Sequence, residues 1–337
     1  MQLAAARTVR VEDVAREAGV SPITVSRALS APHKLRPETR ARVMEAVART
    51  GYVVNSIASS LRSGRSAIIA VFVASLENRH FASAVQGALD AFEHSRFRLM
   101  FAQTGYTEAL GAALVDAIKP FRPAALMFTG VQLEPAARAA VAALGVPVME
   151  VWSDSTAAID MAAGASIEAG ARLMGAHFAA RGFSRVAYCG HTDGPGSAGL
   201  RGFRQGYEAA ARPVGHVQAL EGTGTFARGM AAFDAILEAL PGCDAMFFGS
   251  DVLAAAALAQ ARARGIAVPD AIAVAGYGDL DFAAHMQPPL TSIRVSDYDT
   301  GRLAGQLLRQ RLEGTMPADP VIQVPMELML RASTGGA

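Results

Sequence analysis

The sequence has little cysteine and no long apolar run, and each shortage excludes a class of protein. Its 337 residues include two cysteines, too few for a disulfide framework or a cysteine metal cluster. Cys189 and Cys243 both lie inside apolar runs, so we expect buried thiols in a protein of the reducing cytoplasm. The best apolar runs, such as Ala67–Ala74, have the length of a strand, whereas a membrane span needs about 20 residues. Met1–Arg16 has no apolar block that ends in a cleavage site, so we expect no secretory signal.

Motifs of the common enzyme classes are also missing. The chain has no HExxH, no P-loop and no G-x-S-x-G, and its seven histidines are scattered singly, so we expect neither a catalytic nor a metal site. One stretch imitates a dinucleotide site, because Gly194–Gly199 reads G-x-G-x-x-G and Glu221 follows about 20 residues later. However, Gly190–Asp193 separates the expected strand from the first glycine, and Pro195 removes an amide from the phosphate nest. An NAD-dependent protein is therefore the weaker alternative, and we expect no cofactor.

Charge divides the chain into two parts of opposite sign. A hydrophobic fraction of 51% and a charged fraction of 18% exclude a mainly disordered chain. A length of 337 residues exceeds one ordinary core, so we expect two or three structural units. Residues 1–66, the head, carry eleven Lys or Arg and five Asp or Glu, a net charge of +6, whereas residues 67–337, the body, have a net charge of −5. This asymmetry predicts that the head alone binds a polyanion.

The head has the pattern of a helix-turn-helix. Its first helix is expected to bury one apolar face at the spacing i, i+3, i+4, i+7: Val11, Val14, Ala15 and Ala18. Gly19 ends this helix at a position that tolerates positive φ. Ser21 and Pro22 are typical of the cap and first residue of a second helix, Pro22–Leu29. A third helix is expected over Pro37–Thr50.

The start of the second helix enters the major groove of DNA in this motif. Arg27 can make a bidentate contact to guanine, and Thr24 and Ser26 have the size to bond phosphate oxygens or base edges. We expect the DNA-contacting surface to lie here: Ser21, Pro22, Ile23, Thr24, Ser26 and Arg27. The alternative, a helical hairpin with a solvated face, does not account for the coincidence of cap, turn and basic surplus.

These motifs resemble those of the LacI–GalR family of transcriptional regulators. Val11–Leu29 reads V-x-D-V-A-x-x-A-G-V-S-x-x-T-V-S-R-x-L, and Gly51–Asn55 with Ala58 and Leu61 resembles the family's next segment. The resemblance covers the whole chain and implies a DNA-binding transcriptional repressor, which binds double-stranded operator DNA as a homodimer. It also implies a hinge helix in which Asn55, Ala58 and Leu61 contact the minor groove. The implied domains are residues 1–54 for DNA binding, 55–66 for hinge helix and linker, and 67–337 for effector binding and dimerisation.

Strands and helices alternate along the body, which predicts an α/β fold with parallel sheets covered by helices on both faces. The pattern occurs twice, so we expect two lobes, as in periplasmic binding proteins. The expected strands are Ala67–Val73, Arg98–Ala102, Ala124–Phe128 and Val146–Val151, then Arg185–Cys189, His216–Ala219, Ala245–Phe248 and Ile272–Ala275. The tail, with a helix at Tyr298–Leu312 and a strand near Val321–Val324, is expected to return to the first lobe.

Ligands of open parallel sheets bind beyond the carboxyl ends of the strands, so the sequence predicts one small effector between the lobes. The candidate contact residues follow expected strands or open the next helix: Ser75, Asn78, Phe81, Glu150, Arg201, Ser250, Asp279 and Asp281. Arg201 matches the family arginine that holds ligand hydroxyls or a carboxylate, for which a planar guanidinium is suited. Asp279 matches a family acid that accepts from sugar hydroxyls. The commonest aspartate of this family loop would fall on Gly278.

Several local runs resemble the gluconate-repressor branch of the family: Ser75-Leu76 with Asn78 and Phe81-Ala82, Gly145–Glu150, and Ala275–Asp279. This resemblance implies a sugar acid, such as gluconate or a ketogluconate, as the effector. A carboxylate at Glu150 repels such a ligand unless Arg201 or a histidine offsets its charge. Glu150 either orients Arg201 or belongs to a hinge or interface salt bridge. The alternatives are a regulator of the same family that responds to a neutral sugar and, from another class, a solute-binding protein.

Overall fold

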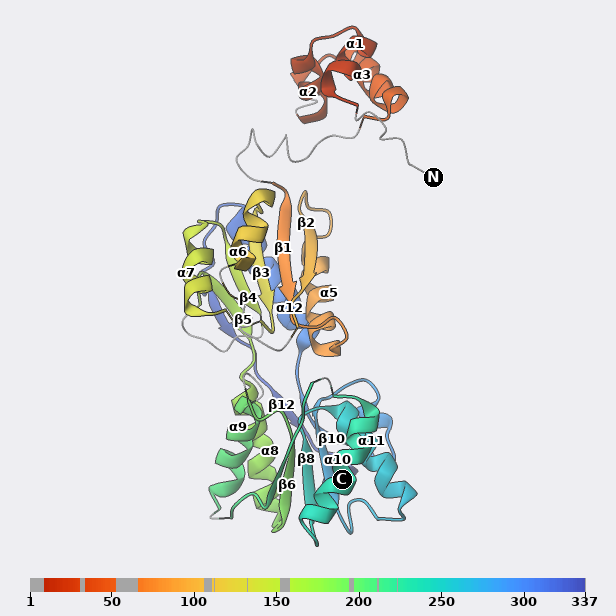
Figure 1. The fold of residues 1–337 in the computed structure, drawn as a ribbon, viewed down its shortest axis with the longest axis vertical. Coiled ribbons are helices and arrows are strands. Elements are labelled where there is room, and N and C mark those ends of the chain that lie inside the picture. The colour runs from red at the N-terminus through yellow and green to blue at the C-terminus, as the bar shows by residue number, and fades with distance from the viewer. Residues whose placement is uncertain are drawn as a thin grey trace. The chain divides into compact units, whose positions relative to one another are not determined.

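The computed structural model describes residues 9–30, 34–52, 66–105, 111, 113–131, 133–151, 158–193, 197–210, 212–222 and 224–336. The chain divides into two compact units, the head (residues 1–66) and the body (residues 67–337). The ribbon of each unit is drawn in Figure 1.

In the described residues of the head, three helices enclose a small apolar core (Figure 1). They are α1 (Val11–Ala18), α2 (Pro22–Ser30) and α3 (Pro37–Thr50). Gly19 ends α1 at φ +62°, a left-handed conformation that favours glycine. Val14, Val25 and Val43, one from each helix, are fully buried. The helix-turn-helix prediction is confirmed. The apolar periodicity and the residues at the helix ends act over only a few residues, so the sequence alone is enough to predict this motif.

The first lobe of the body is built on a six-stranded parallel sheet of order β11-β5-β4-β3-β1-β2. Its strands are β1 (Ile68–Val73), β2 (Arg98–Gln103), β3 (Ala125–Thr129), β4 (Val148–Val151), β5 (Met161–Gly164) and β11 (Val321–Gln323). One face is covered by α5 (Arg79–Ala91) and α12 (Asp297–Leu312), and the other by α6 (Ala113–Ile118) and α7 (Pro135–Ala143). Successive strand residues face opposite layers, so Met127 packs under α5 and α12 while Phe128 packs under α6 and α7.

The second lobe repeats this plan with the strand order β12-β10-β9-β8-β6-β7. Its strands are β6 (Val186–Gly190), β7 (His216–Ala219), β8 (Ala245–Phe248), β9 (Ala273–Gly278), β10 (Thr291–Arg294) and β12 (Glu327–Met329). One face is covered by α8 (Ile167–Arg181) and α9 (Ser197–Glu208), and the other by α10 (Phe226–Ala239) and α11 (Asp251–Ala263). Only the edge strand β12 runs antiparallel to its neighbour in this described sheet. The predicted α/β class with two parallel-sheet lobes is thus confirmed.

The chain passes three times between the lobes, from β5 to α8, from β10 to α12, and from β11 to β12 (Figure 1). The tail helix and the strand near Val321 do rejoin the first lobe, as predicted. The sequence does not predict β12, which returns to the second sheet. Three connections at one place hold the strand ends of the two sheets near each other, where a ligand site is expected.

Helices α8 and α9 approach so closely that glycine is required at their contact. A Cβ on Gly202 would overlap the backbone carbonyl of Glu168, and one on Gly175 would overlap the backbone of Phe203. The contact at Gly202 fixes the part of α9 that carries Arg201 against the first turn of α8, where Glu168 lies.

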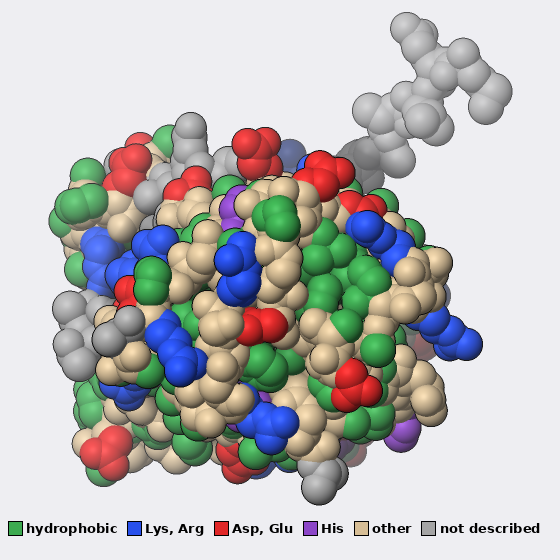
Figure 2. Space-filling view, turned by 90° about the horizontal axis from the view of Figure 1, so that it is seen from below, with side chains coloured by type: hydrophobic (Ala, Val, Ile, Leu, Met, Phe, Trp, Pro, Cys, Tyr) green, Lys and Arg blue, Asp and Glu red, His purple; other side chains and the backbone are tan. Residues whose placement is uncertain are grey.

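The surface at the lower end of the body mixes charges of both signs, as Figure 2 shows. Lys and Arg side chains are interspersed there with Asp, Glu and apolar groups. A face of this kind does not concentrate positive charge, in keeping with the acidic composition of the body. Within the described ranges no helix is both long enough and apolar enough to span a bilayer.

Candidate functional site

The start of α2 is an exposed, capped helix end. Ser21 Oγ accepts a hydrogen bond from Thr24 N at 3.3 Å, so this serine caps the helix as the sequence predicts. Ile23 is 64% exposed, and Arg27, four residues later, lies on the same helix face. The other residues predicted to contact DNA are exposed or half-buried: Ser21, Pro22, Thr24, Ser26 and Arg27. This face of α2 is therefore exposed and available to a groove of DNA.

Two features of the sequence lie wholly or partly outside the described residues. Asn55, Ala58 and Leu61, the expected minor-groove contacts, belong to residues 53–65. The hinge helix therefore stays a prediction. Residues 194–196 of the G-x-G-x-x-G stretch are likewise outside the described ranges.

Three candidate residues lie together where β1 ends. Ser75 is 5% exposed, and Asn78 caps α5 because its Oδ1 accepts from His80 N at 3.0 Å. The ring of Phe81 covers Gly130, which follows the neighbouring strand β3, so closely that a Cβ there would overlap it. The structure brings these residues to one edge of the sheet and gives Asn78 and Phe81 structural roles as well.

Glu150 is neutralised within its own lobe. Arg138 of α7 contacts the carboxylate from Nη1 at 2.6 Å and from Nη2 at 3.4 Å, and Ile159 N donates to Oε2 at 2.8 Å. The side chain of Glu150 is 10% exposed. Arg138, and neither Arg201 nor a histidine, therefore offsets this charge, and the idea that Glu150 orients Arg201 is wrong.

Arg201 is instead oriented by Glu168 at the start of α8. Its Nε and Nη2 lie 3.2 and 3.1 Å from Glu168 Oε2, and Nη1 donates to Ser197 Oγ at 2.7 Å. Gln205 Nε2 donates to the other oxygen of Glu168 at 2.7 Å. Arg201 remains 56% exposed, so its guanidinium is preorganised by α8 and still open to an oxygen-rich ligand.

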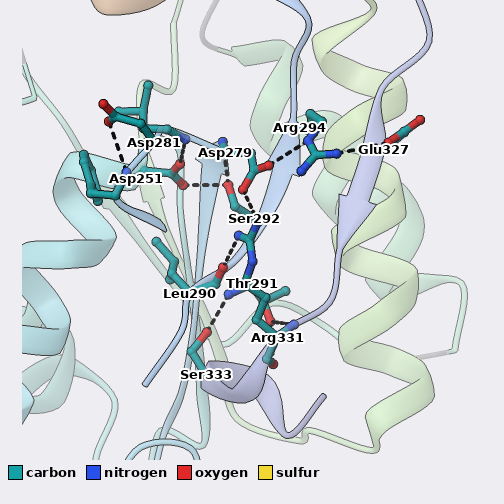
Figure 3. Close-up of polar contacts among 12 residues, drawn as sticks. Asp251, Asp279, Asp281, Leu290, Thr291, Ser292, Arg294, Glu327, Arg331 and Ser333 are labelled. Carbon is teal, nitrogen blue, oxygen red and sulfur yellow. Dashed lines mark hydrogen bonds and ion pairs between the residues drawn. The ribbon is translucent and has the colours of Figure 1, made fainter. Parts of the chain in front are cut away.

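In the second lobe, a polar network surrounds the segment that follows β9 (Figure 3). Ser250 caps α11 by accepting from Val252 N at 3.2 Å. Asp251 is fully buried and accepts from Leu280 N at 2.7 Å and from Ser292 Oγ at 2.6 Å. Burial raises the pKa of Asp251, and the hydrogen bonds from Ser292 and Leu280 oppose that shift. The carboxylate thus fixes the segment from inside the lobe.

Asp279 lies between two arginines, as Figure 3 shows. Arg331 Nη2 is 2.6 Å from Oδ1, and Arg294 Nε is 2.7 Å from Oδ2. Asp279 has φ +50°, a left-handed conformation that aspartate tolerates better than most residues. Its side chain is 6% exposed. A ligand hydroxyl would share this carboxylate with both arginines.

Asp281 points to the first lobe. Its Oδ2 is 3.3 Å from Nη2 of Arg79, at the start of α5, and the two side chains are 73% and 61% exposed. An ion pair so open to water contributes less than about 1 kcal/mol. The ion pair does show that the strand ends of the first lobe and those of the second lobe face each other closely enough for direct contact.

Sequence reasoning misses the partners of the candidate acids and of Arg201. These are Arg138, Glu168, Arg294 and Arg331. Each comes from an element remote in sequence or lies on the solvent side of a helix pattern, so no local signal marks it. Asp251 carries a weak signal, because it follows a capping serine directly after a strand.

A helix-turn-helix joined to a two-lobed body of this topology defines a class of ligand-responsive DNA-binding regulators. Residues 10–55 match the family described as "Bacterial regulatory proteins, lacI family", and residues 176–334 match the "Periplasmic binding protein-like domain". The HTH-type transcriptional regulator GntR of Pseudomonas aeruginosa is 31% identical over 327 residues, 96% of this chain and 95% of that protein. The chain belongs to the LacI family of transcriptional regulators, and it is not an enzyme.

Further relatives and solved structures also match this chain over nearly its whole length. The GntR regulator of Escherichia coli K12 is 26% identical and covers 97% of this chain and 98% of its own. The crystal structure of a LacI-family transcriptional regulator from Silicibacter pomeroyi superimposes with a TM-score of 0.89 at 25% identity, over 97% of this chain and 99% of that one. The lac repressor dimer bound to operator, at 23% identity and a TM-score of 0.79 over 97% of this chain and 99% of that one, shares the fold. The predicted family is confirmed, and the NAD-dependent and solute-receptor alternatives fall away.

Proposed function

We propose that this regulator is a cytoplasmic, homodimeric repressor of sugar-acid catabolism, whose operator binding is controlled by an effector such as gluconate or a ketogluconate. Residues 1–54 bind DNA, residues 55–66 form the hinge helix and linker, and residues 67–337 bind the effector and form the dimer. The resemblance to the gluconate-repressor branch and the two GntR-named relatives support a sugar-acid role.

The observation that carries the choice of an acid is the pairing of the candidate carboxylates with arginines. Glu150 contacts Arg138, and Asp279 contacts Arg294 and Arg331. The repulsion that these two acids would exert on an anionic effector is therefore offset within each lobe. Arg201 then supplies the planar fork, and an effector carboxylate would share it with Glu168. Ser75, Asn78, Phe81, Ser250 and Asp281 complete the proposed contact set.

On DNA, two heads of the dimer occupy two half-sites of a near-palindromic operator. The exposed face of α2 lies in the major groove, where Arg27 reads guanine. The hinge segments of the two subunits pair over the minor groove, and Leu61 wedges between base steps. Arginine and lysine side chains elsewhere in the basic head contact phosphates.

Effector binding couples to DNA through the lobes. The ligand draws the two lobes together, the contact between the first lobes of the dimer changes, and the hinge helices separate. To move this equilibrium from 1:99 to 99:1, the effector must bind one state about 5.5 kcal/mol more tightly than the other. Contacts made to both lobes at once supply such a difference, because they are complete only in the closed state.

A neutral sugar is the second candidate effector. One structural neighbour is the transcriptional regulator CelR in complex with cellobiose, which is 26% identical to this chain with a TM-score of 0.66 and covers 96% of this chain and 99% of its own. Asp279 could accept from sugar hydroxyls beside its arginines. A family member can therefore use the same fold for an uncharged ligand.

Calorimetry of the full chain with gluconate, 2-ketogluconate, glucose and ribose tests the proposal. An acid should bind most tightly. Arg201→Lys keeps the charge and loses the fork, so the best acid should bind about tenfold more weakly, or ~1.4 kcal/mol. Arg204→Lys on the same helix is the matched control, since Arg204 contacts Glu208 at 3.7 Å, and it should leave binding unchanged.

Arg201→Ala extends the same test to the response. This variant should still bind operator DNA while the acid no longer releases it. If a neutral sugar binds more tightly than every acid, or if the Arg201 and Arg204 variants behave alike, the sugar-acid assignment is wrong. The family assignment does not depend on that result.

A further inference from the structure

The start of α5 in the first lobe contacts the end of β9 in the second lobe. His80 is the second residue of α5, and its ring lies against Gly278, the last residue of β9. A Cβ on Gly278 would overlap Cε1 of the ring and stand 2.6 Å from Nε2. Tyr277 meets the same ring edge-on, with 6.4 Å between ring centroids. The imidazole therefore fills a space between the lobes that a side chain at residue 278 would close.

The ring is held to the first lobe beside one of the crossings between the lobes. His80 Nδ1 lies 2.6 Å from Oδ2 of Asp297, and the two side chains are 15% and 9% exposed. Asp297 is the first residue of α12, which packs on the first lobe. Val295, two residues earlier, still packs in the core of the second lobe. The chain thus changes lobe just before Asp297, and His80 is anchored next to that point.

The contact between the ring and Gly278 joins two surfaces that separate when the lobes open. Packing contacts of this kind act over short distances, so they are lost as soon as the surfaces move apart. The ion pair between Arg79 and Asp281 crosses the same boundary, but both side chains are exposed and water screens their attraction. The buried ring contact is therefore the stronger of these two contacts, and it favours closed lobes.

We propose that His80 and Gly278 form an interlobe latch, a contact within the protein that stabilises the closed arrangement of the two lobes. The latch supplies part of the free energy of closure, so the effector has to supply less of it. A weakened latch shifts the lobes toward the open arrangement and lowers the affinity for every ligand of the closed lobes by the same factor. The inference rests on the proposed function only for the response on DNA, because lobe closure itself is measured without effector or DNA.

The distance between two spin labels, one in each lobe of the full chain, measures closure. Ala113 is the first residue of α6 in the first lobe, Arg204 lies on α9 in the second lobe, and both are exposed. Ala113→Cys and Arg204→Cys provide the attachment sites. The native Cys189 and Cys243 are buried, which raises the pKa of each thiol to about 12, so they react far more slowly than an exposed cysteine. An excess of unlabelled chain restricts the measured distances to those within one subunit.

Two substitutions disturb the latch from opposite sides. His80→Asn keeps a donor near Nδ1 for Asp297 and removes the ring edge that lies against Gly278, whereas Gly278→Ala adds the Cβ that overlaps this edge. The matched control is Gly130→Ala. Gly130 also has a positive φ, and a Cβ there would overlap the ring of Phe81, but both of these residues belong to the first lobe. The control therefore creates the same kind of overlap without a contact between the lobes.

The wild type should show mainly the distance of the closed lobes. His80→Asn should lower the ratio of closed to open populations about fivefold, and Gly278→Ala should lower it at least as much. Gly130→Ala should lower Tm but leave the distances unchanged.

The double variant separates the latch from local strain at residue 278. Once His80→Asn has removed the ring edge, Gly278→Ala should open the lobes no further, because its Cβ has nothing to meet. Fully additive opening in the double variant overturns the proposal. Distances that are the same in the wild type and in both single variants overturn it too, as does a wild type with mainly open lobes. These outcomes do not depend on which effector binds, so a failed latch leaves the proposed function standing.

Discussion

Removal of the Asp251 carboxylate is expected to destabilise the second lobe and to release the segment after β9. Asp251 is fully buried and accepts from Leu280 N at 2.7 Å and from Ser292 Oγ at 2.6 Å. Ser292 Oγ accepts in turn from Asp279 N at 3.0 Å. The Asp251 carboxylate thus holds Leu280 directly and Asp279 through Ser292, and these two residues begin the segment that follows β9.

The magnitude follows from these two bonds. A hydrogen bond to a charged group contributes about 1.5–3 kcal/mol, so the pair could contribute about 3–6 kcal/mol. Part of this is offset, because burial opposes ionisation and raises the pKa of Asp251. We expect Asp251→Ala to lower the free energy of unfolding by about 2–4 kcal/mol. Asp251→Asn keeps an acceptor for Leu280 N, so its loss should be about 1 kcal/mol.

Calorimetric unfolding of the full chain measures both losses. A change of 1 kcal/mol lowers Tm by about 2–4 °C in a unit of this size, so the Ala variant should melt about 5–10 °C below the wild type. The Asn variant is the isosteric control and should melt about 2–4 °C below it. A loss under about 1 kcal/mol for Ala, or equal losses for the two variants, would refute the reasoning.

The wild type and Asp251→Asn should also differ in how their free energy of unfolding depends on pH. The pKa of Asp251 is raised above its ordinary value of 3.8 in the folded state, so the folded protein binds this proton more tightly than the unfolded chain. The contribution of Asp251 to wild-type stability is therefore fully present below pH 3.8 and is lost as pH rises through the raised pKa. Asp251→Asn lacks this dependence, so the stability difference between wild type and Asn variant should be larger in acid than at neutral pH.

Three further changes test other parts of the molecule. Arg27→Ala should weaken operator binding by about 1–3 kcal/mol and relax base preference at one position per half-site; a gel-shift series with unchanged affinity and preference excludes Arg27 as a base reader. Leu61→Ala should lose operator affinity while effector binding and Tm of the free protein persist, and a clear drop in that Tm would make Leu61 a core residue. Arg138→Met leaves Glu150 without its cation and should lower stability by about 2 kcal/mol. Adding Glu150→Gln should restore most of that loss, and no recovery of Tm would contradict the pairing.

The elements that the sequence predicts well are those whose signals are local. The sequence predicts the described helices α1, α2 and α3 to within one residue at each end, because apolar spacing, a capping serine and the end glycine act within a few residues. Strands β7 and β8 also have the predicted bounds, since each is a short run between clear breaks. Topology follows from the strict alternation of strand and helix.

The elements that the sequence misses take their structure from neighbours. Strand β5 reads Met-Ala-Ala-Gly, which favours a helix locally, yet it pairs with β4 and β11 on its two sides. Strands β10 and β12 are short: β10 pairs with β9, and β12 pairs with β10 at the edge of the second sheet. Sheet pairing decides such segments, and pairing is not visible in a window of a few residues.

In the candidate site, too, the features with a local signal are predicted and those that depend on remote elements are not. The rule of strand ends places Arg201, Asp279 and Glu150 at the ends or starts of the right elements. It does not reveal that each is paired with an opposite charge, because Arg331, Arg138 and Glu168 come from other elements. Those pairings change the electrostatic expectation, from two acids that repel an anion to acids already balanced by arginine.

The most direct test of the account is the effect of a sugar acid on DNA binding by the full chain. Fluorescence anisotropy would follow labelled duplex DNA, selected by the protein from a random pool, in the presence of gluconate, 2-ketogluconate or glucose. The account predicts that one of the acids weakens binding at least tenfold and that glucose at the same concentration does not. DNA binding that ignores both acids, or that responds to glucose instead, would contradict it.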